Sequence, residues 1–196
     1  MTLSSEQILW RQGQPADRVV ILCGAAAIVS TCTPGGDRRV MELMTRGSVL
    51  GLGDALSGRS RCCEAEVVIP GPCLVFTGDQ LRYKVRQGGA AALAVAGLMS
   101  TVARQSGGRV AELGYGSVAA RLARVVLRLC NEHGALGARG TVVPIRISRA
   151  RLALVLGCRP ETLCRALQDP LLSRTLTVEA DFIVVPDMAQ LTRLAT

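Results

Sequence analysis

One segment near the C-terminus constrains the fold of this 196-residue chain more than any other. It runs Ile147-Ser-Arg-Ala-Arg-Leu-Ala-Leu-Val-Leu-Gly-Cys-Arg-Pro-Glu-Thr-Leu-Cys-Arg165. The pattern predicts a helix capped by Ser148, a tight turn at Gly157, and a second helix whose first residue is Pro160. Apolar residues recur at helical spacing in both helices: Leu152, Val155, Leu156, Leu163 and Leu167. One side of the helix pair should therefore pack on a core while the other stays polar.

The polar side of the second predicted helix carries Glu161, Thr162 and Arg165. A helix-turn-helix needs this arrangement to lay its second helix in the major groove of DNA. An ordinary helical hairpin with a solvated charged face is the alternative, because isolated matches to such motifs are often false.

The distribution of charge favours the DNA-binding interpretation over the ordinary hairpin. The formal net charge is +8, and residues 117–174 alone contain ten arginines against three acidic residues. Arginines can neutralise phosphates and release counterions, which supplies most of the non-specific affinity for DNA. A merely solvated face would usually mix both signs of charge.

Length and composition exclude several classes of protein. The chain is long enough for one large or two small domains. Its longest apolar run, Ala90 to Met99, is too short to cross a membrane, and no secretory signal is evident, so we expect a cytoplasmic protein without a membrane partner. Its eight cysteines are therefore expected to be mostly reduced and buried. No Cys-x-x-Cys pair accompanies the single histidine, His133, and no metal site is predicted.

The N-terminal half reads as short strands between glycine-rich turns, which indicates a small sandwich or barrel. The predicted strand-type runs are Val19–Cys23, Ala26–Cys32, Val40–Met44, Gly47–Gly53, Ala65–Ile69 and Cys73–Thr77, with a turn at Pro34-Gly-Gly-Asp37.

The strand-type pattern ends at about Gly78, where the period of the apolar residues changes. Residues 90–113 suit one long helix, with Leu93, Ala96, Leu98, Val102 and Val110 at helical spacing. Its alanine-rich surface would let a second copy approach closely, so we expect it to dimerise; packing on its own barrel is the alternative.

Two further elements complete the C-terminal part. Ser117 should cap a helix that runs to about Asn131. Thr175–Val178 and Phe182–Val185 should form a hairpin, which would be the wing of a winged helix.

Together these features resemble the catabolite-activator/fumarate-nitrate-regulator family of bacterial transcription factors. The motifs that carry the resemblance are Arg11-Gln-Gly-Gln-Pro-Ala-Asp17, Gly24, Gly35-Gly36-Asp37, Gly47-Ser-Val-Leu-Gly51, Leu56-Ser-Gly-Arg-Ser-Arg61 and Leu156-Gly-Cys-Arg-Pro-Glu-Thr-Leu-Cys-Arg165. The resemblance implies an α+β protein with a β-roll (jelly roll) like a cyclic-nucleotide-binding domain at residues 1–88. A dimerisation helix would follow at 89–114, and a winged helix-turn-helix at 115–196.

The resemblance also implies roles for individual residues. Glu161 and Arg165 would read base edges, since glutamate suits the amino group of cytosine and arginine suits O6 and N7 of guanine. Thr162 lies beside them on the same face. The phosphate backbone would lie close to Ser148, Arg149 and Arg159. Arg159 occupies the N-cap position of the second helix, although arginine caps helices poorly. Pro160 stands where catabolite activators have another base-reading arginine, so the operator should differ from theirs.

The resemblance also implies an effector pocket in the β-roll. By resemblance the effector pocket would include Gly51, Leu52, Arg61, Cys62 and Cys63, with Arg61 matching the arginine that binds a cyclic phosphate. Leu52 replaces the glutamate that binds the ribose hydroxyls, and a lost polar partner costs roughly 1–3 kcal/mol, so cyclic AMP is disfavoured. The N-terminus also lacks the cysteine cluster that holds an iron–sulfur centre in the oxygen-sensing branch. The effector and any cofactor are left unidentified.

Cys62 and Cys63 raise a thiol-sensing hypothesis, in which Arg59 and Arg61 lower a thiol pKa and favour the thiolate. Two small residues that fill a barrel are the alternative. Metal or haem sensing also stays open, although His133 lies outside the roll.

The sequence thus predicts a homodimeric DNA-binding regulator that binds a near-palindromic duplex, and RNA polymerase if it activates. A nucleotide-binding module that does not bind DNA is the main rival. An enzyme is a weaker one, because no catalytic constellation is visible.

Overall fold

The computed structural model describes every residue except Pro34 and Tyr115, and the side chains at 105 and 108–114 are outside the description as well. The chain divides into two compact units, Met1–Val110 and Ala111–Thr196. The boundary between them falls inside helix α3 (Gly89–Gly114). The three-part division at residues 88 and 114 stays a prediction.

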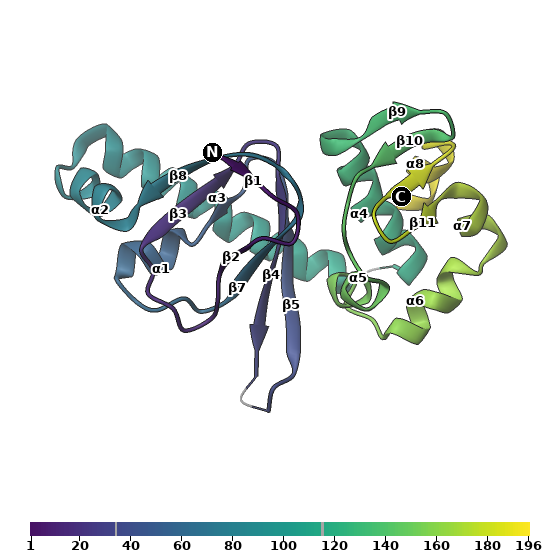
Figure 1. Cartoon of the computed structure of the whole chain (residues 1–196), viewed down its shortest axis with the longest axis horizontal. Helices are drawn as coiled ribbons and strands as arrows, with labels where there is room; N and C mark the ends of the chain where they lie inside the picture. Colours follow the sequence, from purple (N-terminus) through teal and green to yellow (C-terminus); the bar gives the residue numbers. More distant parts are fainter. Residues whose placement is uncertain (34, 115) are drawn as a thin grey trace. The chain divides into compact units, whose positions relative to one another are not determined.

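The N-terminal unit contains two four-stranded antiparallel sheets, which are visible in Figure 1. The first sheet has the strand order β1 (Thr2–Leu3), β8 (Gly71–Thr77), β3 (Arg18–Leu22) and β6 (Val49–Leu50). The second has the order β2 (Ile8–Trp10), β7 (Glu64–Ile69), β4 (Ala26–Cys32) and β5 (Arg38–Met44). Apolar residues from both sheets, such as Trp10, Leu22 and Val67, form one buried cluster. This is the expected β-roll.

Most predicted strands are confirmed, including Ala26–Cys32 with its bounds unchanged. The prediction for Gly47–Gly53 is wrong in part, because the strand there is only Val49–Leu50 and helix α1 (Leu52–Ser57) follows. Gly51 causes the change: its φ of 73° is a left-handed conformation that ends the strand and opens the helix. The turn predicted at Pro34-Gly-Gly-Asp37 is confirmed for Gly35 to Asp37, where the N–H of Gly36 donates to the Thr33 carbonyl at 2.9 Å and Gly36 has a φ of 86°; Pro34 itself lies outside the described residues.

Two more helices follow β8. Helix α2 (Gly78–Arg86), which was not predicted from the sequence, begins with a capping box in which Thr77 and Gln80 bond each other's backbone N–H groups. Helix α3 confirms the long helix expected at 90–113. Its residues Val95 and Leu98 pack on a second buried cluster of the roll, while Leu93 and Met99 are exposed. The side chain of Val110 lies outside the described residues.

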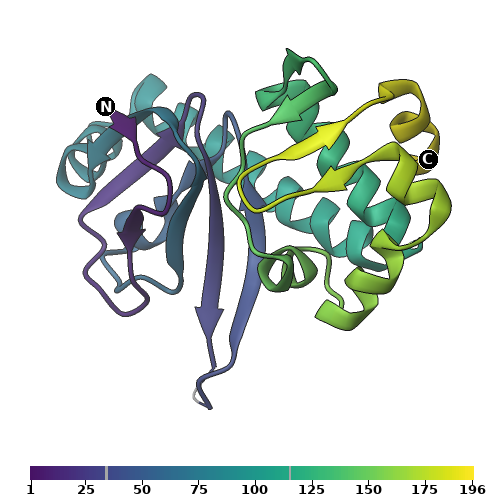
Figure 2. The same cartoon turned by 45° about the vertical axis from the view of Figure 1, so that its right-hand side comes forward.

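The C-terminal unit combines helices with one four-stranded antiparallel sheet. Its helices are α4 (Val118–His133), α5 (Arg149–Val155), α6 (Pro160–Leu167), α7 (Pro170–Thr175) and α8 (Met188–Ala195). Its sheet has the order β11 (Thr177–Val178), β12 (Ile183–Val185), β10 (Gly140–Val143) and β9 (Ala135–Gly137). In Figure 2 the sheet forms one face of this unit, with α4 behind it. Helix α4 and strand β10 both supply fully buried apolar side chains, among them Leu122, Val126, Leu129 and Val143.

The helix predicted from Ser117 to about Asn131 is confirmed, and the Ser117 side chain accepts a hydrogen bond from the N–H of Ala120. The wing hairpin is confirmed as β11 and β12, although Thr175 belongs to α7 and not to a strand. Strands β9 and β10 and helices α7 and α8 were not predicted. Within the described part of the chain, no helix combines the length and hydrophobicity needed to cross a bilayer.

Candidate nucleic-acid interface and effector site

The helix-turn-helix forms as its sequence predicts. The Ser148 side chain caps α5 by accepting a hydrogen bond from the N–H of Arg151. Gly157 adopts a left-handed conformation, with φ of 63°. The N–H groups of Gly157 and Cys158 bond the carbonyls of Leu154 and Ala153, which is the Schellman arrangement that ends a helix and turns the chain.

The second helix of the motif, α6, has one buried and one exposed face. Pro160 occupies its first turn, and Arg159 at the N-cap makes no side-chain capping bond, as expected. Leu163 is fully buried, whereas Glu161 and Arg165 are exposed and Thr162 is partly exposed. The outward polar face is therefore confirmed. The contacts of these residues with DNA stay a prediction.

Two of the three residues predicted to lie near phosphate, Ser148 and Arg149, stand at the start of α5. Ser148 and Arg149 are exposed, and they line a hollow of about 340 Å³ together with Glu179 and Ala180 of the wing. Arg159 is exposed at the start of α6. The fold thus brings the beginning of α5 and the tip of the wing to one surface.

Arg61, the predicted phosphate ligand, is bound to the protein itself. Its side chain is buried, with 1 % of the residue exposed. Its Nη1 donates to the Gly51 carbonyl at 3.3 Å and its Nη2 to the Arg18 carbonyl at 2.5 Å, while Asp17 lies 3.5 Å from Nη2. The guanidinium also stacks 3.9 Å from the centroid of the Trp10 ring. Burial lowers the pKa of Arg61, and the nearby carboxylate of Asp17 opposes that shift.

The other predicted pocket residues lie around Arg61. Gly51 has to be glycine here, because a Cβ would collide with Nη1 of Arg61. Leu52 is buried in the second cluster of the roll with Val19 and Ala55. An apolar side chain in that core offers no acceptor for ribose hydroxyls. The residues present at this place therefore do not fit the ribose of a cyclic nucleotide.

The electrostatic premise of the thiol hypothesis is wrong. Cys62 is exposed and Cys63 is buried. Burial raises the pKa of Cys63 to about 12, and burial with the nearby carboxylate of Asp54 raises the pKa of Cys62. Arg61 lowers the pKa of Cys63 only as a minor cause. The effect of desolvation on the thiol pKa therefore exceeds that of the arginines, so both thiols stay mostly protonated at neutral pH.

This result predicts slow chemistry at Cys63. With iodoacetamide at a pH of about 7.5, the native protein should label the exposed Cys32 much faster than Cys63, because the thiolate is the nucleophile. Labelling of Cys63 should accelerate as the pH rises toward its pKa of about 12 and in denaturant. Peptide mass spectrometry measures both rates. Equal labelling of Cys32 and Cys63 in the native protein near neutral pH would contradict a raised pKa of Cys63.

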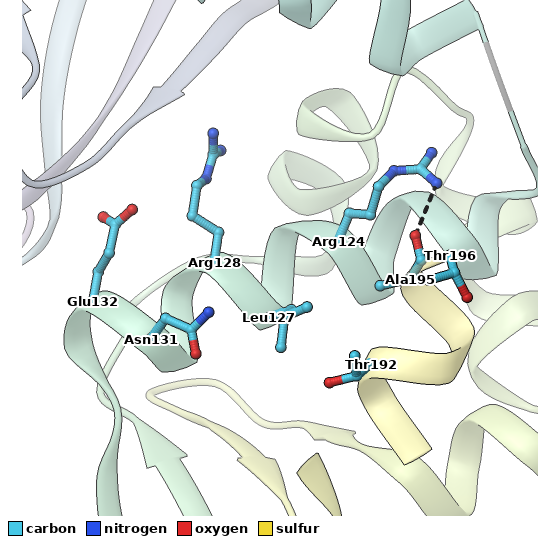
Figure 3. Close-up of a pocket in the computed structure, with 8 residues that line it drawn as sticks. All are labelled: Arg124, Leu127, Arg128, Asn131, Glu132, Thr192, Ala195 and Thr196. Carbon is cyan, nitrogen blue, oxygen red and sulfur yellow. Dashed lines mark hydrogen bonds between the residues drawn. The ribbon is translucent and has the colours of Figure 1, made fainter. Parts of the chain in front are cut away.

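A second hollow, of about 440 Å³, lies between α4 and α8 in the C-terminal unit. Figure 3 shows Arg124, Arg128 and Glu132 along α4, and Thr192 and Ala195 on α8. Arg124 donates to the Ala195 carbonyl at 3.4 Å, so it helps to hold α8 on α4. None of the predicted site residues lines this hollow. Among the described residues, no three His, Cys, Asp or Glu side chains form a group that could hold a metal ion.

Two family models match the chain, one in each unit. A cyclic nucleotide-binding domain matches residues 1–87, and a Crp-like helix-turn-helix domain matches residues 120–194. The chain belongs to the CRP/FNR family of transcription regulators. This CRP/FNR regulator therefore has the β-roll and the winged helix-turn-helix that its sequence predicted.

The similarity to known relatives covers the whole of this CRP/FNR chain. A global nitrogen regulator from Nostoc sp. is 22% identical over 100% of the chain and 88% of its own length. A CRP-family transcriptional regulator from Thermus thermophilus shares the fold with a TM-score of 0.80 at 20% identity, covering 100% of this chain and 96% of that one. FixK2 from Bradyrhizobium japonicum shares the fold with a TM-score of 0.78 at 20% identity, covering 100% of this chain and 96% of that one.

Proposed function

We propose that this CRP/FNR regulator binds a near-palindromic duplex as a homodimer, with one α6 helix in each of two successive major grooves, roughly 34 Å apart. Glu161, Thr162 and Arg165 would face the bases, while Ser148, Arg149 and Arg159 would face phosphates. One observation carries the proposal: α6 buries Leu163 completely and leaves Glu161 and Arg165 exposed. A regulator of this kind would act in the cytoplasm, would contact RNA polymerase if it activates, and would not be an enzyme.

Salt-dependent binding to DNA tests this function. The purified protein should bind fluorescein-labelled duplexes selected from a random library, and the affinity should fall steeply as salt rises, because bound arginines release counterions. A nucleotide-binding module that contacts only proteins would bind no duplex at low ionic strength. That outcome would refute the proposal.

Helix α3 supports the homodimer. Val95 and Leu98 pack on the roll, whereas Leu93 is 75 % exposed and Met99 is also exposed. Between them lie small exposed residues, Ala96 and Gly97, which permit a close approach of two helices. A second copy would cover this apolar face.

Leu93→Glu should therefore dissociate the dimer. Burial of a leucine contributes roughly 1.5–3 kcal/mol, and the change removes it from both copies, so dimerisation should weaken by about 3 kcal/mol or more. Analytical ultracentrifugation measures the effect. Leu136→Glu is the matched control, because Leu136 is 93 % exposed in the other unit and should leave the dimer intact. An unchanged dimer in Leu93→Glu would exclude this face of α3 as the interface.

We also propose that an unidentified signal acts through the roll. Two donors there, Trp10 Nε1 and Arg61 Nε, are buried without a hydrogen-bond partner among the described residues. Buried donors normally have acceptors, so this place could take an acceptor group from an effector. Absorption and mass spectra of the protein purified from its own host would identify a bound group.

A further inference from the structure

The wing of the helix-turn-helix carries negative charge at its tip. Glu179 and Asp181 lie in the turn between β11 and β12, which is closed by a hydrogen bond from the N–H of Glu179 to the Phe182 carbonyl at 2.9 Å. Glu179 lines the same hollow as Ser148 and Arg149. A phosphate that approached Ser148 and Arg149 would therefore also approach an acidic side chain.

Each wing acid holds one arginine from outside the wing. Arg139, in the turn between β9 and β10, lies 3.3 Å from Glu179, and its guanidinium is 5.7 Å from the centroid of the Phe182 ring. Arg146, just before α5, lies 2.9 Å from Asp181. All four side chains are at least one-third exposed. Exposed ion pairs contribute little and are screened by salt, so a phosphate can replace either carboxylate.

We propose that Glu179 and Asp181 restrain Arg139 and Arg146 and so determine how strongly the wing binds DNA of any sequence. While the acids hold them, the two arginines do not neutralise phosphates, and the acids themselves repel the backbone. Non-specific affinity is thereby kept low, whereas base reading by α6 is unaffected. Because phosphate contacts carry no sequence information, the restraint should lower the affinity for every duplex by a similar factor. The inference rests on the proposed DNA-binding function.

Neutral variants of the wing test the proposal. The probes are a labelled duplex of random sequence and a duplex selected for preferred binding, and the variants are Glu179→Gln and Asp181→Asn. Affinity for the random duplex should rise several-fold in both variants. In Glu179→Gln, which releases Arg139, the slope of log affinity against log salt should also steepen by about 1. Affinity for the preferred duplex should rise by a similar factor, so the ratio of preferred to random affinity should stay close to that of the wild type. Asp37→Asn is the control, since it removes one exposed acid from the other unit.

The same change made in a variant that lacks the paired arginine distinguishes release of that arginine from simple loss of negative charge. In Arg139→Gln, Glu179→Gln should no longer steepen the salt slope, because the arginine that it would release is absent. Thermal melting confirms that each variant is folded. Wild-type slopes and affinities in both wing variants would overturn the inference while the DNA-binding function stands. If the wild type itself binds no duplex, the function and the inference both fail.

Discussion

Replacing Arg165 by alanine should lower the affinity for the preferred operator by about 1–3 kcal/mol and relax specificity at one base pair of each half-site. Arg165 is exposed on α6, whose opposite side is anchored by the buried Leu163, so the substitution removes a reading group without disturbing the core. Affinity for random duplex should change far less. Fluorescence anisotropy with the preferred operator and its single-base variants measures the effect.

Arg149→Ala is the matched comparison. It removes the same charge from the exposed start of α5, where the proposed contact is with phosphate. Affinity should fall by a similar factor on every sequence, and the salt slope should decrease by about 1. If Arg165→Ala also weakened all duplexes equally, base reading by Arg165 would be excluded.

The reading helix could be predicted because its signals are local. Ser148 caps α5, Gly157 adopts the left-handed conformation of the turn, and Pro160 begins α6, and each acts within a few residues of its own position. Helix α2 had a comparable signal that was not recognised in the sequence, since Thr77 and Gln80 form a capping box. Strand β9 has no such signal in the sequence, because all of its residues are exposed and its apolar and polar residues do not alternate.

The surroundings of Arg61 and of the two cysteines could not be predicted in the same way, because tertiary contacts determine them. The sequence places Arg59 and Arg61 beside the two cysteines, yet burial of Cys63 decides its pKa. Likewise, nothing near Arg61 in the sequence indicates that Trp10 and the Arg18 carbonyl surround its guanidinium. Burial and long-range contacts of this kind follow only from the folded chain.

Arg61→Ala should destabilise the roll by about 3 kcal/mol in the absence of any ligand. The substitution removes two hydrogen bonds from a charged group, each worth roughly 1.5–3 kcal/mol, and leaves the carbonyls of Gly51 and Arg18 without that donor. It also removes the stacking on Trp10, while relief from burying a charge offsets part of the loss. For a unit of this size the melting temperature should fall by roughly 10 °C or more, as measured by calorimetry.

Arg59→Ala provides the control, since it removes an exposed arginine from the same loop and should leave the melting temperature nearly unchanged. An arginine that served only a ligand would behave like Arg59 in the ligand-free protein, because its loss would remove no internal contact. A melting temperature of Arg61→Ala equal to that of the wild type would therefore show that the internal bonds of Arg61 do not stabilise the roll. A large decrease would show that any effector at this place has to compete with Gly51, Arg18 and Trp10 for the guanidinium, which makes release of Arg61 a requirement for binding there.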